Sequence, residues 1–155
     1  MDNKIIRDEL FNLMYGKNAH ATFEQAVENF PYNFINKKVV GIDHSPWQII
    51  EHMRIAQWDI LEFIRNPEYQ ELEFPVEYWP KEISATFEMW EESILNFKAD
   101  FSEFIKIINN ENTQFFASIP HAKDYTIFRE ILLLANHNSY HTGQLIFIRK
   151  AFNIW

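Results

Sequence analysis

The 155-residue sequence predicts an all-α fold, specifically a four-helix bundle. Four long segments carry apolar residues at alternating steps of three and four, which is the spacing of an amphipathic helix. Only 3 glycines are present, whereas sandwiches and barrels need many glycine turns. The composition is 47% hydrophobic and 17% aromatic, enough for a sizeable core. No repeat or linker divides the chain, so we expect a single domain over residues 1–155.

The first helical segment is expected over residues 3–30, because Pro31 cannot continue a helix. Gly16 lies in its middle and leaves open a break into two pieces. His20 falls on the apolar stripe of this segment and is therefore expected to face the core. The stripe consists of Ile6, Leu10, Leu13, Gly16, His20, Phe23, Val27 and Phe30.

The second segment has the clearest start signal. Ser45 is expected at the N-cap, Pro46 at the first helical position and Gln48 at the third, which together form a capping box. The helix is expected to end near residue 64, before Asn66-Pro67. One face carries Ile49, His52, Ala56, Asp59, Ile60 and Phe63.

Two further helices are expected, over residues 84–108 and 126–151. The loop over residues 66–83 holds three prolines and four large aromatic residues and is longer than most connections. It is expected either to cover a pocket mouth or to seal one end of the bundle. The inner stripe of the last helix consists of Glu130, Leu134, His137, His141, Leu145 and Ile148.

Composition and motifs exclude several functional classes. The net charge is −8 and the 14 Lys and Arg residues are scattered, so no nucleic-acid partner is expected. No segment is apolar enough for a signal peptide or a membrane span, so no membrane partner is expected. The absence of cysteine fits a reducing cytoplasm, where we expect the protein. The sequence contains no HExxH zincin motif, no Glu-x-x-His di-iron motif and no GxSxG elbow.

The segment His137-Asn-Ser-Tyr-His141 predicts a metal site. Residues four apart on a helix have Cβ atoms about 5–6 Å apart, so two such imidazoles can bind one ion. His52 also interrupts an apolar helix face and is the best third ligand. Three imidazoles would hold one divalent ion with open positions, and zinc or nickel suits them best. The alternative is that these are core histidines satisfied by hydrogen bonds, but burying three without a shared partner would be costly.

The remaining polar candidates are compatible with more than one role. Asp59 lies two turns after His52 on the same face, where it would orient a ligand, act as a base or pair with a nearby Lys or Arg. His20 is a second candidate for a catalytic role. His44, expected at the surface, and His121, expected in the loop before the last helix, are further candidates.

The second-helix segment HSPWQIIEHMRIAQWDILEF, followed by HNSYHTGQL near the C-terminus, resembles the DinB-like (DinB/YfiT) superfamily of metal-binding four-helix bundles. The resemblance covers nearly the whole chain, and HxxxH followed by Gly-Gln is its most specific part. It implies up-down-down-up connectivity and a zinc or nickel ion held by His52, His137 and His141. Some relatives are S-transferases or isomerases that use low-molecular-weight thiols.

The first functional expectation is a metal-dependent enzyme that acts on a small molecule, either a transferase, which could depend on a low-molecular-weight thiol, or a hydrolase. One alternative is a non-catalytic metal- or ligand-binding stress-response protein. Another is a structural metal that only stabilises the core. We also expect a homodimer. The reason is that aromatic residues such as Trp47, Trp90 and Trp155 exceed what one small core needs and would expose an apolar patch.

Overall fold

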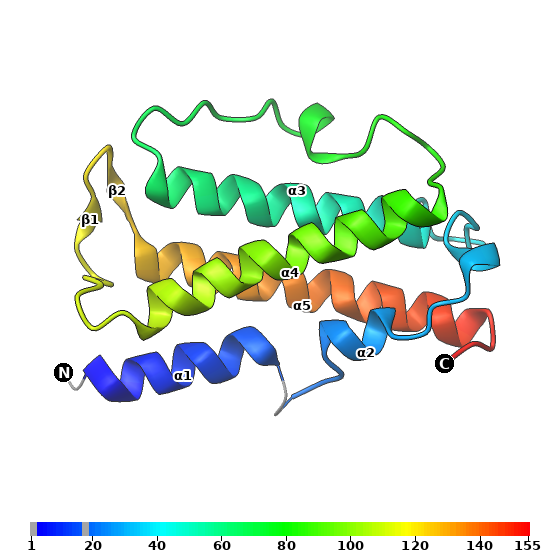
Figure 1. The fold of residues 1–155 in the computed structure, drawn as a ribbon, viewed down its shortest axis with the longest axis horizontal. Coiled ribbons are helices and arrows are strands. Elements are labelled where there is room, and N and C mark those ends of the chain that lie inside the picture. The colour runs from blue at the N-terminus through cyan, green and yellow to red at the C-terminus, as the bar shows by residue number, and fades with distance from the viewer. Residues whose placement is uncertain (1–2, 17–18) are drawn as a thin grey trace.

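The structure is a computed structural model that describes residues 3–16 and 19–155, and it is mainly α-helical (Figure 1). This content agrees with the predicted all-α class. The helices are α1 (Asn3–Tyr15), α2 (Phe23–Val27), α3 (Pro46–Arg65), α4 (Phe87–Asn109) and α5 (Ile127–Ala151), with short 3-10 helices η1 (Tyr32–Phe34) and η2 (Val76–Tyr78). One antiparallel hairpin that the sequence did not predict pairs β1 (Ser118–Ile119) with β2 (Ala122–Thr126).

The first helical segment is broken at Gly16. This residue has a φ of +64°, a left-handed conformation that glycine adopts readily, and its N–H bonds to the carbonyls of Asn12 and Leu13. A Cβ at this position would lie 2.8 Å from Cε1 of His20. Helix α1 therefore ends at Tyr15, and the next helix among the described residues is α2. The expectation that His20 faces the core is wrong, because it lies in the connecting segment and is exposed.

The predicted capping box of α3 is confirmed. Ser45 Oγ accepts a hydrogen bond from the backbone N–H of Gln48, and Gln48 Oε1 accepts one from the N–H of Ser45. Pro46 is the first helical residue, as expected. Thr126 caps α5 and confirms its predicted start. Helix α4 begins later than predicted because Thr86 is its N-cap, with Oγ1 accepting from the N–H of Met89.

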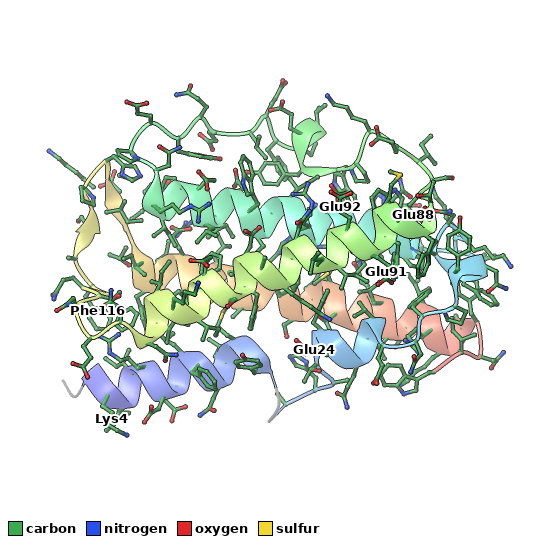
Figure 2. The ribbon with its side chains drawn as sticks, viewed as in Figure 1. Lys4, Glu24, Glu88, Glu91, Glu92 and Phe116 are labelled. Atoms are coloured by element: carbon green, nitrogen blue, oxygen red, sulfur yellow. The ribbon has the colours of Figure 1, made fainter. Side chains whose placement is uncertain are left out.

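The long helices α3, α4 and α5 lie side by side, and α1 and α2 follow one another beside α4 and α5 (Figure 1). Helices α1 and α5 begin at the end of the molecule where the N-terminus lies, whereas α3 and α4 begin at the opposite end. Two buried clusters fill the space between the helices. One contains Trp90 and Phe97 of α4, and the other contains Phe104 of α4 and Leu134 of α5. The exposed residues Glu88, Glu91 and Glu92 lie at the start of α4 (Figure 2).

The segment between α3 and α4 returns along the outer side of α3 (Figure 1). It therefore covers a long helix rather than only one end of the molecule. None of the described helices is both long and apolar enough to cross a membrane. Of the tryptophans expected to add to an apolar surface, Trp47 and Trp90 are only 3% and 2% exposed and belong to the core, while Trp155 is 53% exposed.

Candidate metal centre

The structure brings together the three histidines singled out in the sequence. His52 comes from the middle of α3, and His137 and His141 come from successive turns of α5. Their Nε2 atoms converge: that of His52 lies 3.0 Å from that of His137 and 3.1 Å from that of His141. The candidate ligand nitrogens all lie within 4.8 Å of one another. Among the described residues, these three histidines form the only group of His, Cys, Asp or Glu side chains that has the spacing of a metal site.

Two hydrogen bonds determine which nitrogens carry protons. Nδ1 of His52 lies 2.7 Å from the carbonyl oxygen of Tyr78, which can only accept, so His52 carries its proton on Nδ1. Nδ1 of His141 lies 2.7 Å from Oε1 of Gln144, whose amide nitrogen in turn faces the hydroxyl of Tyr140. His141 therefore also donates from Nδ1. The Nε2 atoms of both neutral rings are left unprotonated and point at one another.

This arrangement fits a bound cation. Two unprotonated Nε2 atoms at 3.1 Å cannot hydrogen-bond to each other, and in neutral rings their lone pairs repel. The third ring, His137, has a buried Nδ1 with no hydrogen-bond partner in the described part of the chain. A proton on Nε2 of His137 could serve His52 but would leave Nδ1 of His137 and Nε2 of His141 without a proton-donor or acceptor partner, whereas a divalent ion would bind all three converging Nε2 lone pairs. Metal-bound histidines commonly donate their other N–H to a carbonyl in this way.

Burial keeps the three rings neutral. Desolvation lowers the pKa of His52 from its ordinary value of 6.5, and this outweighs the opposing hydrogen bond to Tyr78. Desolvation and the neighbouring rings lower the pKa of His137 to about 3. Desolvation lowers the pKa of His141 to about 4 although its bond to Gln144 acts in the opposite direction. Neutral imidazole is the form that binds metal, so the cluster is ready for an ion near neutral pH.

Trp79 forms one wall of the centre. Its ring is stacked between two imidazoles, with centroids 4.1 Å from His52 and 3.7 Å from His44 and interplanar angles of 8° and 16°. His44 is half-buried by this stack, so the expectation that it lies at the surface is wrong. The stack restrains the ring of His52 from the face, while the Tyr78 carbonyl restrains it from the edge.

Asp59 is close to the centre but does not contact the histidines by any hydrogen bond. Both of its carboxylate oxygens accept from tyrosine hydroxyls of the 66–83 loop, Oδ1 from Tyr69 and Oδ2 from Tyr78 at 2.8 Å. Burial and these bonds to Asp59 raise the pKa of both tyrosines, so they remain protonated donors. Among the described residues, Asp59 neither bonds to a histidine of the cluster nor pairs with a Lys or Arg, so two of its expected roles are not observed. Asp59 instead anchors the loop.

His20, the second catalytic candidate, is not part of the centre. Its Nδ1 lies 2.8 Å from the carbonyl of Ala21, and its Nε2 lies 2.5 Å from Oγ of Ser139. Ser139 lines a small cavity together with residues of α1 and α2 such as Met14 and Phe23, whereas His137 and His141 meet His52 of α3. His20 therefore lies on another side of α5 from the three histidines.

Two other polar residues of the sequence analysis also lie elsewhere. His121 is in the β1–β2 turn, where its Nε2 donates to the carbonyl of Phe63 at 2.7 Å. Glu130 is only 2% exposed and pairs with Arg129 at 2.7 Å. Neither is within the group that could hold a metal.

The three histidines open onto a cavity of about 1050 Å³. This volume is at the upper end of what small-molecule sites occupy. The cavity lies between α3, α5 and the 66–83 loop, and its walls include Trp79, Tyr140 and Phe147. An ion at the cluster would therefore be accessible to a molecule that enters from outside.

Sequence reasoning missed the groups that orient the ligands. Gln144 had a signal, since it lies three residues after His141 and so on the same face of the helix. The Tyr78 carbonyl had none, because it is a backbone atom of a loop distant in sequence from His52. Trp79 was visible only as one of several aromatic residues in that loop.

Comparisons of the chain with protein-family models, with curated proteins and with solved structures gave no match. The assignment of the site therefore rests on the geometry of His52, His137 and His141 and on the sequence motifs that contain them.

Proposed function

We propose that the protein is a metal-dependent enzyme that acts on a small molecule through one divalent ion held by His52, His137 and His141. The reaction would be a transfer, with a low-molecular-weight thiol as the candidate substrate, or a hydrolysis. The observation that carries the proposal is the convergence of the Nε2 atoms of three neutral histidines at the wall of an open cavity. Zinc and nickel are the ions that best suit three imidazoles.

The proposal includes a DinB-like four-helix bundle with up-down-down-up connectivity. In support, α1 and α5 run one way and α3 and α4 the other, with α2 continuing the course of α1 (Figure 1). A cytoplasmic location is part of the same proposal, since the chain has no cysteine that an oxidising compartment would pair.

An open site favours chemistry over a purely structural metal. Structural zinc sites are usually closed by four protein ligands, whereas catalytic sites use three and keep a position for substrate. The described part of the chain offers three ligands at this cluster. A zinc or nickel ion supplies Lewis-acid chemistry, which polarises a substrate atom and favours loss of its proton.

The protein's own residues have distinct roles in this proposal. The Tyr78 carbonyl and Gln144 hold His52 and His141 in the tautomer that presents Nε2. Trp79 excludes water from one face of His52. Asp59 fixes the loop that carries both Tyr78 and Trp79.

One observation favours the second candidate, a non-catalytic metal- or ligand-binding protein. A general base is expected within reach of a reacting group. Asp59 has both oxygens engaged by tyrosines, and His20 lies on another side of α5. An enzyme built on this centre would therefore depend on the ion, or on the substrate itself, for proton transfer.

Turnover separates the two candidates. The purified chain would be loaded with zinc or nickel and assayed against a panel of thiol-transfer, ester and amide substrates. Turnover by the loaded protein, lost both in the apo protein and in His137→Ala, supports the enzyme. A fully loaded protein that converts none of the panel supports the non-catalytic binder.

A further inference from the structure

The cavity in front of the three histidines has mainly apolar walls. On α5 it is lined by Leu133, Tyr140 and Phe147, which are spaced seven apart and so lie on one face of the helix. All three are exposed despite their size. They extend over about 21 Å of the helix, on both sides of the two histidines of α5. Phe74 and Trp79 of the 66–83 loop form the facing wall.

The formal charges at the cavity wall are negative. Asp43 and Asp59 line it, and among the described residues no Lys or Arg does, although the chain has 14 of them. Asp59 has both oxygens bonded to tyrosines. Asp43 is exposed and forms no ion pair with a described residue. It is therefore the free negative charge of the wall.

Asp43 lies close to the metal centre along the ring stack. It precedes His44, whose ring is 3.7 Å from that of Trp79, which is in turn 4.1 Å from the ring of His52. Burial lowers the pKa of His44, and the nearby charges of Asp43 and Lys38 raise and lower it respectively; of these two charged side chains only Asp43 lines the cavity. A ligand that reaches from the histidines past Trp79 would meet this carboxylate.

The neighbouring cavity offers no substitute site for an anion. It shares Asp59, Tyr78 and Leu133 with the first cavity and contains Arg129. The guanidinium of Arg129 is paired with the buried Glu130 at 2.7 Å and lies over the ring of Tyr125, 4.7 Å from its centroid. Its charge is thus already compensated within the protein.

We propose that the cavity selects uncharged or cationic small thiols with an aromatic or other apolar body, and discriminates against anionic ones. This inference rests on the proposed function and names its substrate class. The sulfur would approach the three histidines, the apolar body would lie against Trp79 and Tyr140, and the far group would meet Asp43. A cationic far group would face the opposite charge of Asp43 and the aromatic rings, whereas an anionic far group would be repelled by Asp43 and find no Lys or Arg among the described residues of the wall. The positive charge of the ion acts at the other end of the ligand, on the sulfur.

Three probes of matched shape test the selection. They are benzyl thiols that carry an aminomethyl, a methyl or a carboxylate group in the para position. Their dissociation constants for the zinc-loaded protein would be measured by isothermal titration calorimetry. We expect the carboxylate probe to bind about tenfold more weakly than the other two, since placing like charges together is costly.

The variant Asp43→Asn tests whether Asp43 is responsible for the discrimination between the probes. It should reduce the advantage of the aminomethyl probe and improve binding of the carboxylate probe, while leaving the methyl probe unchanged. Asp124→Asn is the matched control, because Asp124 is exposed on β2 and does not line the cavity. An equal effect of both variants would overturn the role of Asp43.

Failure of this inference can be told apart from failure of the proposed function. A carboxylate probe that binds as tightly as the others overturns the selection, while the metal site and turnover remain as proposed. If none of the three probes binds the loaded protein, both the selection and the thiol-dependent function are overturned.

Discussion

His52 on α3 donates its Nδ1 proton to the backbone carbonyl of Tyr78, 2.7 Å away in the loop that leads to α4. The side chain of the same tyrosine donates to Asp59, seven residues after His52 on the same helix. One residue of the loop is therefore bonded to α3 at two points, by its backbone and by its hydroxyl. The loop positions a candidate metal ligand and does more than cover the pocket.

The first prediction concerns this anchoring. Tyr78→Phe removes one of the two donors to the buried carboxylate of Asp59, a loss that typically costs about 1–3 kcal/mol. We expect faster amide hydrogen exchange in residues 66–83 and a metal affinity lowered by about tenfold. Tyr32→Phe is the control, since this exposed tyrosine neither bonds to Asp59 nor lines the cavity. Unchanged exchange in Tyr78→Phe would show that the hydroxyl does not hold the loop.

A second prediction concerns the orientation of His141. Gln144→Leu keeps the approximate size of the side chain but removes the acceptor for Nδ1 of His141. Loss of such an orienting partner typically lowers metal affinity by about 10–100-fold. Competition with a chelating dye would measure it. Gln114→Leu, at an exposed position outside the cavity, should bind metal like wild type. Equal affinities of the two variants would contradict the role of Gln144.

The sequence predicted the helices best where local signals and burial agree. Ser45 and Gln48 cap α3 as expected, because a capping box depends only on residues three apart. Local signals alone did not decide the break at Gly16, since glycine in a helix carries only a modest cost and the outcome depends on what surrounds it. The hairpin before α5 was missed because its five-residue strand β2 is mostly exposed and shows no alternation of apolar residues.

The candidate site was predicted where helical spacing determines it. His137 and His141 share a face because they are four apart, and His52 faces them because it lies on the apolar stripe of α3. The role of Asp59 could not be predicted, because its partners Tyr69 and Tyr78 come from a loop whose path local rules do not specify. His20 was misplaced because its position on the stripe assumed a continuous helix.

A third prediction concerns metal content. The purified protein should bind close to one divalent ion per chain, as measured by elemental analysis, because the described ligands form a single cluster. His137→Ala should lose the ion. His121→Ala should retain it, since His121 bonds to the carbonyl of Phe63 outside the cluster. Equal metal content in wild type and His137→Ala would show that the site has been assigned to the wrong residues.

A fourth prediction concerns assembly. A homodimer stays a prediction, but of the three tryptophans that motivated it only Trp155 is available at the surface. We expect sedimentation velocity to show a dimer at micromolar concentration. If Trp155 lies in the interface, Trp155→Ser should weaken association by about tenfold or more, since buried tryptophans often dominate such contacts. Leu95→Ser, at another exposed apolar position, is the control. A monomer throughout would refute the dimer.

A fifth prediction concerns the pH dependence of the apo protein. The folded-state pKa of His137 is lowered to about 3 and that of His141 to about 4, whereas both should be near 6.5 in the unfolded chain. Between these values the unfolded state binds more protons, so the free energy of unfolding decreases as pH falls below about 6.5. Chemical denaturation at a series of pH values would measure this. His137→Leu should show a smaller decrease, and an identical profile would contradict the depressed pKa.

The same depressed pKa values determine where metal ceases to stabilise the fold. The difference in stability between loaded and apo protein depends on whether the folded apo protein binds protons at the ligand nitrogens. Because His137 and His141 resist protonation until about pH 3 and about pH 4, this difference should persist on moving from neutral to mildly acidic pH. It should then be lost as pH approaches those values. A gap that already closes near pH 6.5 would mean that the rings titrate like exposed histidines and that burial does not keep them neutral.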